Sequence, residues 1–270
     1  MRKMINHQPQ RLSRILLGLI PLILLVIIYM IASDSRLSVN ASDKLLPSFY
    51  DMGNAFYRSA FEPDPRTGQY TLWVDTLASL LRLLSGILCS AFLGLILGIF
   101  CGALPAIRAL LSPLVTLLAL IPPLAILPIL FIIFGLGELS KVVLITIGVT
   151  PFIARDLQQY VQSIPKEQII KAQTLSGNSA QIVWRIILPQ LLPRLVDAIR
   201  LSLGSAWLFL IAAEAIAATE GLGYRIFLMR RYLAMDVILP YVAWITLLAF
   251  IFDALLYGIS RRCWPWYFVK

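Results

Sequence analysis

The sequence has 270 residues, of which 59% are hydrophobic and only 14% are charged, whereas a soluble domain carries nearer one quarter charged residues. Lipid is therefore its main solvent, and we expect an all-α integral membrane protein. The net charge of +9 does not indicate nucleic-acid binding, because no recognition module accompanies it and lysines and arginines collect in the cytoplasmic loops of membrane proteins.

Six apolar segments predict about six transmembrane helices. They are residues 15–32, 83–104, 113–135, 141–154, 199–218 and 237–259. The first follows a basic stretch, as in a signal peptide, but it is long enough to cross a bilayer, so we predict that it is retained. The predicted parts of the chain are a tail with the first span (1–35), an external loop (36–75), a membrane core (76–260) and a second tail (261–270).

Lysines and arginines are more frequent on one side of these spans than on the other. A cytoplasmic N-terminus places most of them inside, and an even number of spans then puts both termini in the cytoplasm. The polar segment 157–193 falls on the same side and forms the most basic loop. On the external side, the sequence EPDPRTGQ (62–69) signals a turn, and we expect a loop with a short amphipathic helix there.

Small residues recur every four positions along the second span, and in a helix they all share one face. They are Gly86, Ser90, Gly94, Gly98 and Gly102. Such a face lets another helix backbone approach closely in lipid. The ladder therefore predicts tight helix packing and says nothing about function.

The third span contains Pro122, Pro123 and Pro128, which remove backbone donors and push a helix out of line. A broken helix is tolerated in a membrane where it is buried in protein or lines a cavity. Two interpretations stay open: a kink that serves packing, or a kinked helix that shapes a translocation path.

Two acidic residues lie inside predicted spans, Glu214 and Asp253. A charge at this depth is costly, so each is expected to face the bundle interior or a water-filled cavity. Glu214 is interpreted either as part of a solute path or as a satisfied structural carboxylate. Asp253 lies near the inner end of its span, with arginines beyond it, and is interpreted as structural.

The three cysteines, Cys89, Cys101 and Cys263, are scattered along the chain, and His7 is its single histidine. This pattern matches none of the spacings of metal-binding motifs. We therefore expect no metal site and no cofactor.

The loop 157–193 reads as two short helices with a joint between them. Pro165 and Glu167 suit the first turn of the first helix, which we expect to stop near Leu175. The joint is Ser176-Gly177, where Gly177 is expected to adopt a left-handed conformation. Asn178 or Ser179 can cap the second helix, and Pro189 is expected to end it.

The second loop helix is amphipathic. Its apolar face would hold Ile182, Val183, Ile186 and Ile187, and its polar face Gln181 and Arg185. Such a helix either lies in the lipid interface or inserts in a groove of a partner protein. Periodicity does not choose between them.

The segment IIKAQTLSGNSAQIVWRIILPQLLP (169–193) resembles the EAA loop in the membrane subunits of bacterial ABC importers of the type I fold. Matching positions are Ala172, Ile186, Leu188 and Pro189, and Gly177 comes one place late. Three positions depart from the pattern: Ile170, Lys171 and Ser176.

Three further segments resemble the nitrate/sulfonate/taurine group of these permeases. They are TLASLLRLLSG (76–86), PLAILPILFIIFGLGELSK (123–141) and AAEAIAATEGLGYRI (212–226). More narrowly, the whole chain is similar to permeases associated with urea carboxylase-type enzymes, a group thought to import guanidine- or urea-related compounds.

The resemblance implies a permease subunit in a bacterial inner membrane. A second permease copy, two ATPase subunits and an external substrate-binding protein would be its partners, and a small polar solute its cargo. The second loop helix would be a coupling helix held by the ATPase. The residues assigned to this coupling role are Ala172, Ser176, Gly177, Asn178, Ser179, Ala180, Gln181, Ile182, Val183, Arg185, Ile186, Leu188 and Pro189.

ATP is expected to bind another subunit, because the chain lacks a phosphate-binding GxxxxGK[ST] motif, and GLGELSKV at Gly135 fails its spacing. One alternative is a stand-alone secondary transporter, but only one broken span is evident and paired broken helices are typical of those folds. Another is a membrane enzyme, for which the sequence offers no catalytic set.

Overall fold

The computed structural model describes residues 11–40, 43–65 and 67–268, and within these ranges every regular element is a helix. The first ten residues of the predicted N-terminal tail therefore lie outside the described part. The helices are α1 (Arg11–Leu37), α2 (Phe49–Phe61), α3 (Thr71–Ala103), α4 (Pro105–Leu120), α5 (Pro123–Phe134), α6 (Glu138–Ser163), α7 (Lys166–Thr174), α8 (Ser179–Ile182), α9 (Leu188–Ala217), α10 (Leu222–Arg230) and α11 (Met235–Cys263). A π turn, η2 (Val183–Ile187), joins α8 to α9, and a 3₁₀ turn, η3 (Pro265–Phe268), follows α11. The all-α expectation is confirmed.

Four helices of the described part are long and apolar enough to cross a membrane. They are Leu16–Leu37 of α1, α3, the continuous helix Ser179–Ala217, and α11. The pair α4 and α5 makes a fifth candidate if it counts as one bent span. The predicted fourth span, 141–154, lies in α6, which crosses the centre of the bundle and carries Lys141, Arg155 and Asp156. The number of six spans thus stays a prediction.

The centre of the fold is the packing of α3 on α6. The small-residue ladder of α3 faces α6, and a Cβ atom added at Gly94 would lie 2.6 Å from Cγ2 of Ile153. The same close approach recurs one turn further along the ladder, at Gly98 against Leu157, and two turns back, at Gly86 against Ile145. Ser90, on the same face, keeps its hydroxyl bonded to the Gly86 carbonyl oxygen at 2.7 Å.

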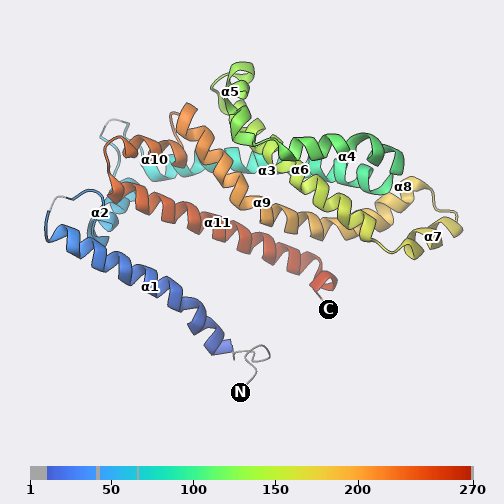
Figure 1. The fold of residues 1–270 in the computed structure, drawn as a ribbon, viewed down its shortest axis with the longest axis horizontal. Helices are drawn as coiled ribbons and strands as arrows, with labels where there is room; N and C mark the ends of the chain where they lie inside the picture. The colour runs from blue at the N-terminus through green and yellow to red at the C-terminus, as the bar shows by residue number, and fades with distance from the viewer. Residues whose placement is uncertain (1–10, 41–42, 66, 269–270) are drawn as a thin grey trace.

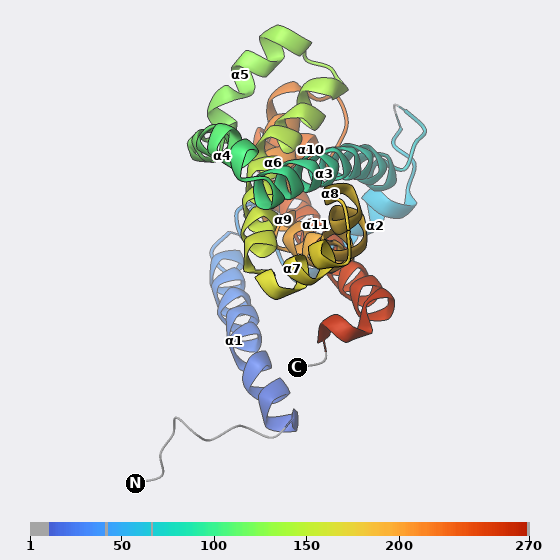
Figure 2. The same cartoon turned by 90° about the vertical axis from the view of Figure 1, so that its right-hand side faces the viewer.

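The helix pair α4 and α5 turns by 96° between them. The turn falls at Ile121-Pro122, and Pro123 begins α5. A proline is tolerated at this position because the first N–H groups of a helix have no partner within the helix. Pro128, in contrast, lies inside α5. The predicted break of this span thus falls at Pro122 and Pro123, and α5 projects from the rest of the bundle (Figure 2).

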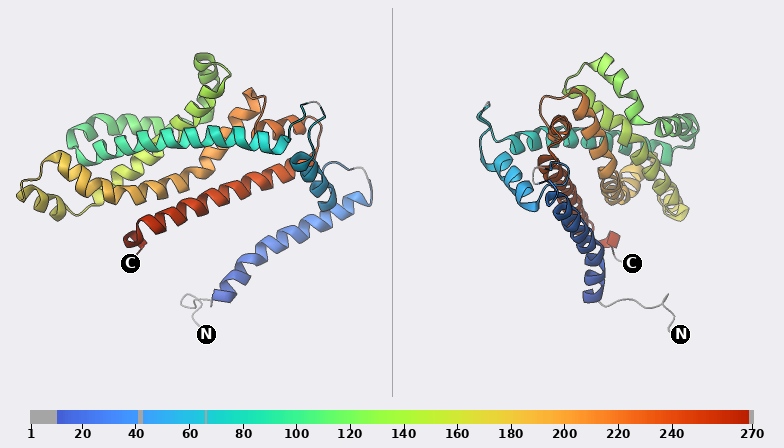
Figure 3. Two further views of the ribbon diagram at one scale, coloured as in Figure 1. Left: turned by 180° about the vertical axis from the view of Figure 1, so that it is seen from behind. Right: turned by 60° about the vertical axis from the view of Figure 1, so that its left-hand side comes forward.

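Helix α1 diverges from the bundle and meets it only near its C-terminal end (Figures 1 and 3). There the hydroxyl of Tyr29 donates to the Pro47 carbonyl oxygen at 2.8 Å, and its ring meets Phe49 of α2 edge-on. Most of the apolar side chains of α1 are exposed. Lipid or a second chain is the environment that suits such a surface.

The two ends of the elongated bundle carry different elements (Figure 1). One end holds α7 and α8, and the opposite end holds α2, α10 and the turn at 62–69. Helix α2 is a short helix in the predicted external loop, capped by Ser48, whose hydroxyl oxygen accepts from the Asp51 N–H at 3.1 Å. The fold thus separates the jointed loop from the predicted external loop by the length of the bundle.

Candidate functional site

The joint between the two loop helices is a tight, fully hydrogen-bonded turn. The Ser176 N–H donates to the Gln173 carbonyl oxygen at 3.0 Å, and the Gly177 N–H donates to the Ala172 carbonyl oxygen at 2.9 Å. This pair of bonds is the Schellman motif that closes many helices. The left-handed residue in it is Ser176, with φ of 63°, so the prediction that Gly177 takes this conformation is wrong.

Gly177 is required for a different reason. A Cβ atom there would lie 2.8 Å from the Ala172 carbonyl oxygen, which is the acceptor of the bond that closes the turn. Gly177 therefore allows a close backbone approach, whereas Ser176 carries the backbone strain. The left-handed position coincides with the position where the EAA pattern has its glycine.

The second loop helix begins with a capping box. The Gln181 N–H donates to Oδ1 of Asn178 at 2.8 Å, and the Asn178 N–H donates to Oε1 of Gln181 at 3.1 Å. Two backbone donors at the start of the helix are thereby satisfied. Asn178, rather than Ser179, is the cap, and the joint is fixed from both sides.

The predicted end of this helix at Pro189 is wrong. The chain stays helical from Ser179 to Ala217, through the π turn Val183–Ile187, and Pro189 lies in the first turn of α9. In the π turn the Leu188 N–H donates to the Val183 carbonyl oxygen, five residues back. A wider turn of this kind accommodates a residue that has no N–H and would otherwise crowd the carbonyl four residues earlier.

The apolar face of the second loop helix is turned into the protein. Ile182 and Ile187 are buried, and Val183 and Ile186 are partly buried against the same core. The hypothesis that Ile182, Val183 and Ile186 contact a partner is not supported by this placement. The π turn contacts α3 and α9, so these side chains pack within the chain itself.

The exposed side of the loop carries a different set of large apolar residues. Trp184 is 69% exposed, Leu175 is 76% exposed and Ile170 is 55% exposed. The predicted residues Ala180, Gln181 and Arg185 are exposed as well. Trp184 and Leu175 were not predicted from the sequence as part of this surface. Helical periodicity could have indicated Trp184, because residues two positions apart, such as Ile182 and Trp184, lie on different faces of a helix. Figure 2 views this end of the molecule with α7 and α8 in front.

Glu214 lies at the far end of α9, in a closed group of polar side chains. Its side chain is buried and accepts from Ser79 Oγ at 2.8 Å, from Arg82 Nη1 at 2.7 Å and from the Gly223 N–H at 2.8 Å. Such a carboxylate is satisfied by the protein. Its placement favours the structural interpretation over a place in the solute path.

The same face of α3 holds the start of α10. Asp75 accepts from the Gly221 N–H at 2.9 Å and from Arg225 Nε at 2.8 Å, while Ser79 Oγ accepts from the Leu222 N–H at 2.8 Å. Burial alone would lower the pKa of Arg225, but the hydrogen bond and the charge of Asp75 raise it above its ordinary value. We call Asp75, Ser79, Arg82 and Glu214 the α10 clamp.

The sequence analysis missed three of the four clamp residues. Asp75, Ser79 and Arg82 follow one another at four and three positions, so they share one helix face. That spacing was a signal, but Asp75 was assigned to the external loop 36–75, and Ser79 and Arg82 precede the apolar segment 83–104. Arg82 also binds Glu138, which in turn accepts from Lys141 Nζ at 2.9 Å.

The remaining predicted residues lie in separate settings. Pro122 and Pro123 are at the α4–α5 elbow and Pro128 lies within α5, whereas Glu214 belongs to the α10 clamp. Asp253 is paired with Arg200 of α9 at 2.8 Å. Among the described residues, no three His, Cys, Asp or Glu side chains are grouped to hold a metal ion.

Comparison with known families places most of the membrane part in one of them. Residues 94–265 match the family described as the binding-protein-dependent transport system inner membrane component. The chain is similar to the taurine transport system permease protein TauC of Escherichia coli strain K12, with 38% identity over 73% of this chain and 72% of that one. It is also similar to the putative aliphatic sulfonates transport permease protein SsuC of Bacillus subtilis strain 168, with 29% identity over 70% of this chain and 68% of that one.

A solved structure shares the fold. The MetNI methionine ABC transporter, in an inward-facing conformation, contains a chain that superimposes with a TM-score of 0.61 and 22% sequence identity, covering 71% of this chain and 96% of that one. At this level of identity the comparison shows a shared fold and nothing more.

Proposed function

This chain belongs to the family of binding-protein-dependent transport system inner membrane components, and we propose that its jointed loop couples the membrane helices to the ATPase of an ABC importer. The chain is the permease subunit of such an importer for small solutes, and ATP is hydrolysed on a separate subunit. The nitrate/sulfonate/taurine group is the part of the family to which its relatives belong.

The observation that carries the coupling role is the continuous helix Ser179–Ala217. One end of it carries exposed Trp184, and the other end carries Glu214 of the α10 clamp. A helix is stiff over this length, so a displacement of the loop would move α9 and the clamp together. This mechanical connection is what an ATPase-driven permease needs.

The docking surface we propose consists of Leu175, Trp184, Ala180, Gln181 and Arg185. Large apolar side chains with a polar rim are typical of protein interfaces. The Schellman turn at Ser176 and the capping box at Asn178 hold this surface in one conformation, which lowers the entropy lost on binding. The buried isoleucines of the same helix anchor it to the core.

The assembly we propose has two permease copies, two ATPase subunits and one external binding protein. Helices α1, α4 and α5 expose long rows of apolar side chains, and lipid and a second copy together would cover them. The loop 157–193 and both termini are then cytoplasmic, and 36–75 faces outward, as the charge bias predicts.

The solute we propose is a small polar compound of the kind for which the relatives are named, taurine or another sulfonate. The narrower resemblance to guanidine- or urea-type permeases has no support from these relatives. A permease that depends on a separate ATPase would transport no solute by itself, whereas a secondary transporter would.

Reconstitution in proteoliposomes tests this function. Taurine uptake is expected only when the permease, its ATPase, the binding protein and internal ATP are all present. Omission of the ATPase is the control. Uptake by the permease alone, driven by an ion gradient, would establish the secondary transporter instead.

A further inference from the structure

Helices α1, α2 and α11 line an apolar groove of about 500 Å³, at the place where α1 meets the rest of the bundle (Figure 1). Every residue that lines this groove is apolar except Tyr29. Leu25 lines it from α1, Gly53 from α2 and Leu239 from α11. A wall of this kind suits hydrocarbon, because a polar solute would lose its hydration there without gaining hydrogen bonds.

A polar pocket of about 440 Å³ adjoins the groove. Tyr29 lines the groove, and its hydroxyl donates at 2.8 Å to the carbonyl oxygen of Pro47, which lines the polar pocket. Helix α2 contributes to both, since Met52 lines the groove and Asp51 lines the polar pocket. The groove and the pocket are therefore the apolar and the polar part of one amphipathic site.

The two parts lie at the depths that a membrane lipid requires. The candidate span of α1 ends at Leu37 and that of α11 begins at Met235. The polar pocket is lined by Leu37 and Asp236, so it lies where both spans leave the membrane. Leu25 of the groove lies roughly 18 Å further along α1, at about 1.5 Å per residue, which is close to half of the hydrocarbon core of about 30 Å. The groove thus covers about one leaflet, and the pocket lies at the level of the headgroups.

Two acidic residues of the polar pocket have partners within the chain. Asp43 is paired with Arg36 at 3.3 Å, and Oδ2 of Asp51 accepts from the Ser48 hydroxyl at 2.7 Å. These contacts hold the segment between α1 and α2 and leave the other charges of the pocket available.

The remaining charged residues of the pocket carry both signs. They are Lys44, Arg58 and Asp236, and none of them makes an ion pair with another residue in the described ranges. A phosphate group suits the two cations, and an ammonium group suits the carboxylate. A zwitterionic phospholipid headgroup has both groups.

We propose that α1, α2 and α11 bind one phospholipid whose headgroup carries a phosphate and a primary ammonium, as in phosphatidylethanolamine. An acyl chain occupies the groove, and the headgroup lies in the polar pocket. This inference goes beyond the proposed function, because it concerns neither the coupling loop nor the transported solute. The lipid fills the space between α1 and α11 and adds to the contacts that hold α1 on the bundle.

Native mass spectrometry of the purified full-length protein, stripped of lipid in detergent and titrated with phosphatidylethanolamine, tests the site. We expect one molecule to bind per chain, more tightly than phosphatidylglycerol, which lacks an ammonium group. Gly53→Leu should weaken binding of both lipids about tenfold or more, because the leucine side chain takes the space of several methylene groups in the groove. A Cβ atom at Gly53 meets nothing within 4 Å, so this variant is expected to fold.

Gly18→Leu is the matched control for the groove. Gly18 also lies in α1 with open space at its Cβ position, but it is not part of the groove wall. The Gly18→Leu protein should bind phosphatidylethanolamine as the wild type does.

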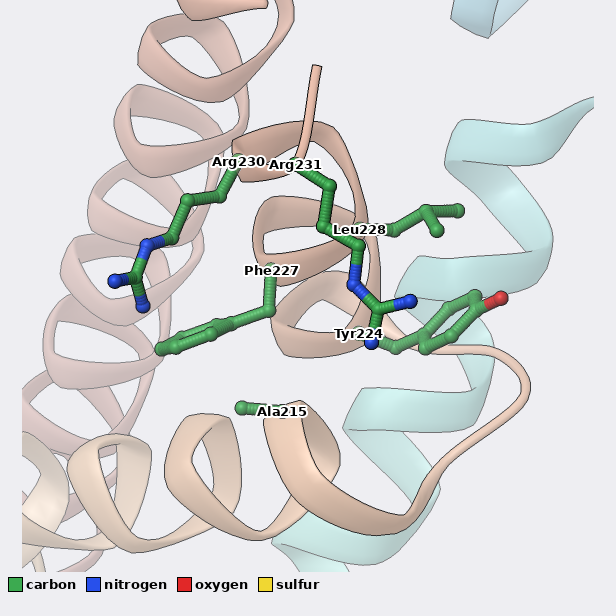
Figure 4. Close-up of a pocket in the computed structure, with 6 residues that line it drawn as sticks. All are labelled: Ala215, Tyr224, Phe227, Leu228, Arg230 and Arg231. Carbon is green, nitrogen blue, oxygen red and sulfur yellow. The ribbon is translucent and has the colours of Figure 1, made fainter. Parts of the chain in front are cut away.

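The headgroup pocket has its own variants. Asp236→Asn should lose the preference for phosphatidylethanolamine over phosphatidylglycerol, because the partner of the ammonium group is gone. Lys44→Gln with Arg58→Gln should weaken binding of both lipids. The control for general charge is Arg230→Gln with Arg231→Gln, since these arginines line a separate pocket and point to different sides of α10 (Figure 4). This control should bind both lipids normally.

Three results would overturn the proposal: a wild-type protein that binds no phosphatidylethanolamine, one that binds phosphatidylglycerol equally well, or a Gly53→Leu protein with unchanged binding. A groove occupied by a second copy would show itself as a lipid-free oligomer that Gly53→Leu dissociates, and this result would also contradict the proposal. None of these outcomes depends on ATP-driven uptake, so the lipid site and the proposed function can fail separately.

Discussion

Arg82 of α3 donates to Glu214 of α9 at 2.7 Å, and both side chains are buried. The two residues lie 132 positions apart in the chain, and with Ser79 they hold the start of α10. Charges in such a position are stable only while each keeps its partner.

Glu214→Ala should reduce transport and the amount of folded protein together. Arg82 would keep its bond to Glu138, but the buried Ser79 hydroxyl and the Gly223 N–H would lose their acceptor, and a buried donor left without a partner typically costs about 1–3 kcal/mol. Thermal unfolding in detergent and membrane abundance measure the loss. Glu220→Ala is the control, since the Glu220 side chain is half exposed and its ion pair with Arg82 is long, at 4.0 Å, whereas its hydrogen bond with Arg82 uses the backbone carbonyl oxygen, which the variant keeps. A Glu214→Ala protein of normal abundance and stability that fails to transport would restore Glu214 to the solute path.

The small-residue ladder leads to a second prediction. Gly94→Leu should prevent α3 from packing on α6, because even a Cβ atom there would lie 2.6 Å from the Ile153 side chain, and overpacking typically costs about 1–3 kcal/mol or more. The measurement is thermal unfolding of the purified protein. Gly258→Leu is the matched control, since a Cβ atom at Gly258 meets nothing within 4 Å. Equal stability of the two variants would contradict the packing.

Helical content and the small-residue face follow from local patterns, and the sequence therefore predicts them. A spacing of four residues places the small residues from Gly86 to Gly102 on one helix face, and this holds whichever helix packs against that face. The partner of the face, α6, was not predictable in the same way, because its residues are distant in sequence. The α10 clamp depends on such distant contacts too, since Asp75 meets Arg225 and Ser79 meets Glu214 only after folding.

The backbone conformation of the loop also could not be predicted from the sequence pattern. Glycine is the usual left-handed residue, so Gly177 was the natural choice, but hydrogen bonding put Ser176 there. Proline usually ends a helix, but the π turn before Pro189 removes the conflict. The exposed face of the second loop helix changes with this geometry, because Ile182 and Ile187 are buried and Trp184 is exposed.

Ser176→Gly should stabilise the joint by about 1 kcal/mol, since glycine adopts a left-handed conformation without the steric conflict of a side chain. Gly177→Ala should destabilise it, because the new methyl group would meet the Ala172 carbonyl oxygen at 2.8 Å. Protease susceptibility of the loop in the purified protein reports both effects. Gly204→Ala, where a Cβ atom has open space, should leave the loop unchanged. Faster cleavage of the Ser176→Gly protein than of the wild type would show that the left-handed turn is not a source of strain.

Trp184→Asp should abolish association with the ATPase while the permease still inserts and folds. The Trp184 side chain is 69% exposed, so its replacement removes no core contact, whereas a carboxylate in a docking groove would be buried without a partner. Co-purification with the ATPase and solute-stimulated ATP hydrolysis measure the effect. Trp266→Asp, which changes a tryptophan that is 52% exposed after α11, provides the matched control and should keep both activities. Normal ATPase association by the Trp184→Asp protein would show that the exposed side of α8 and the π turn does not face the ATPase.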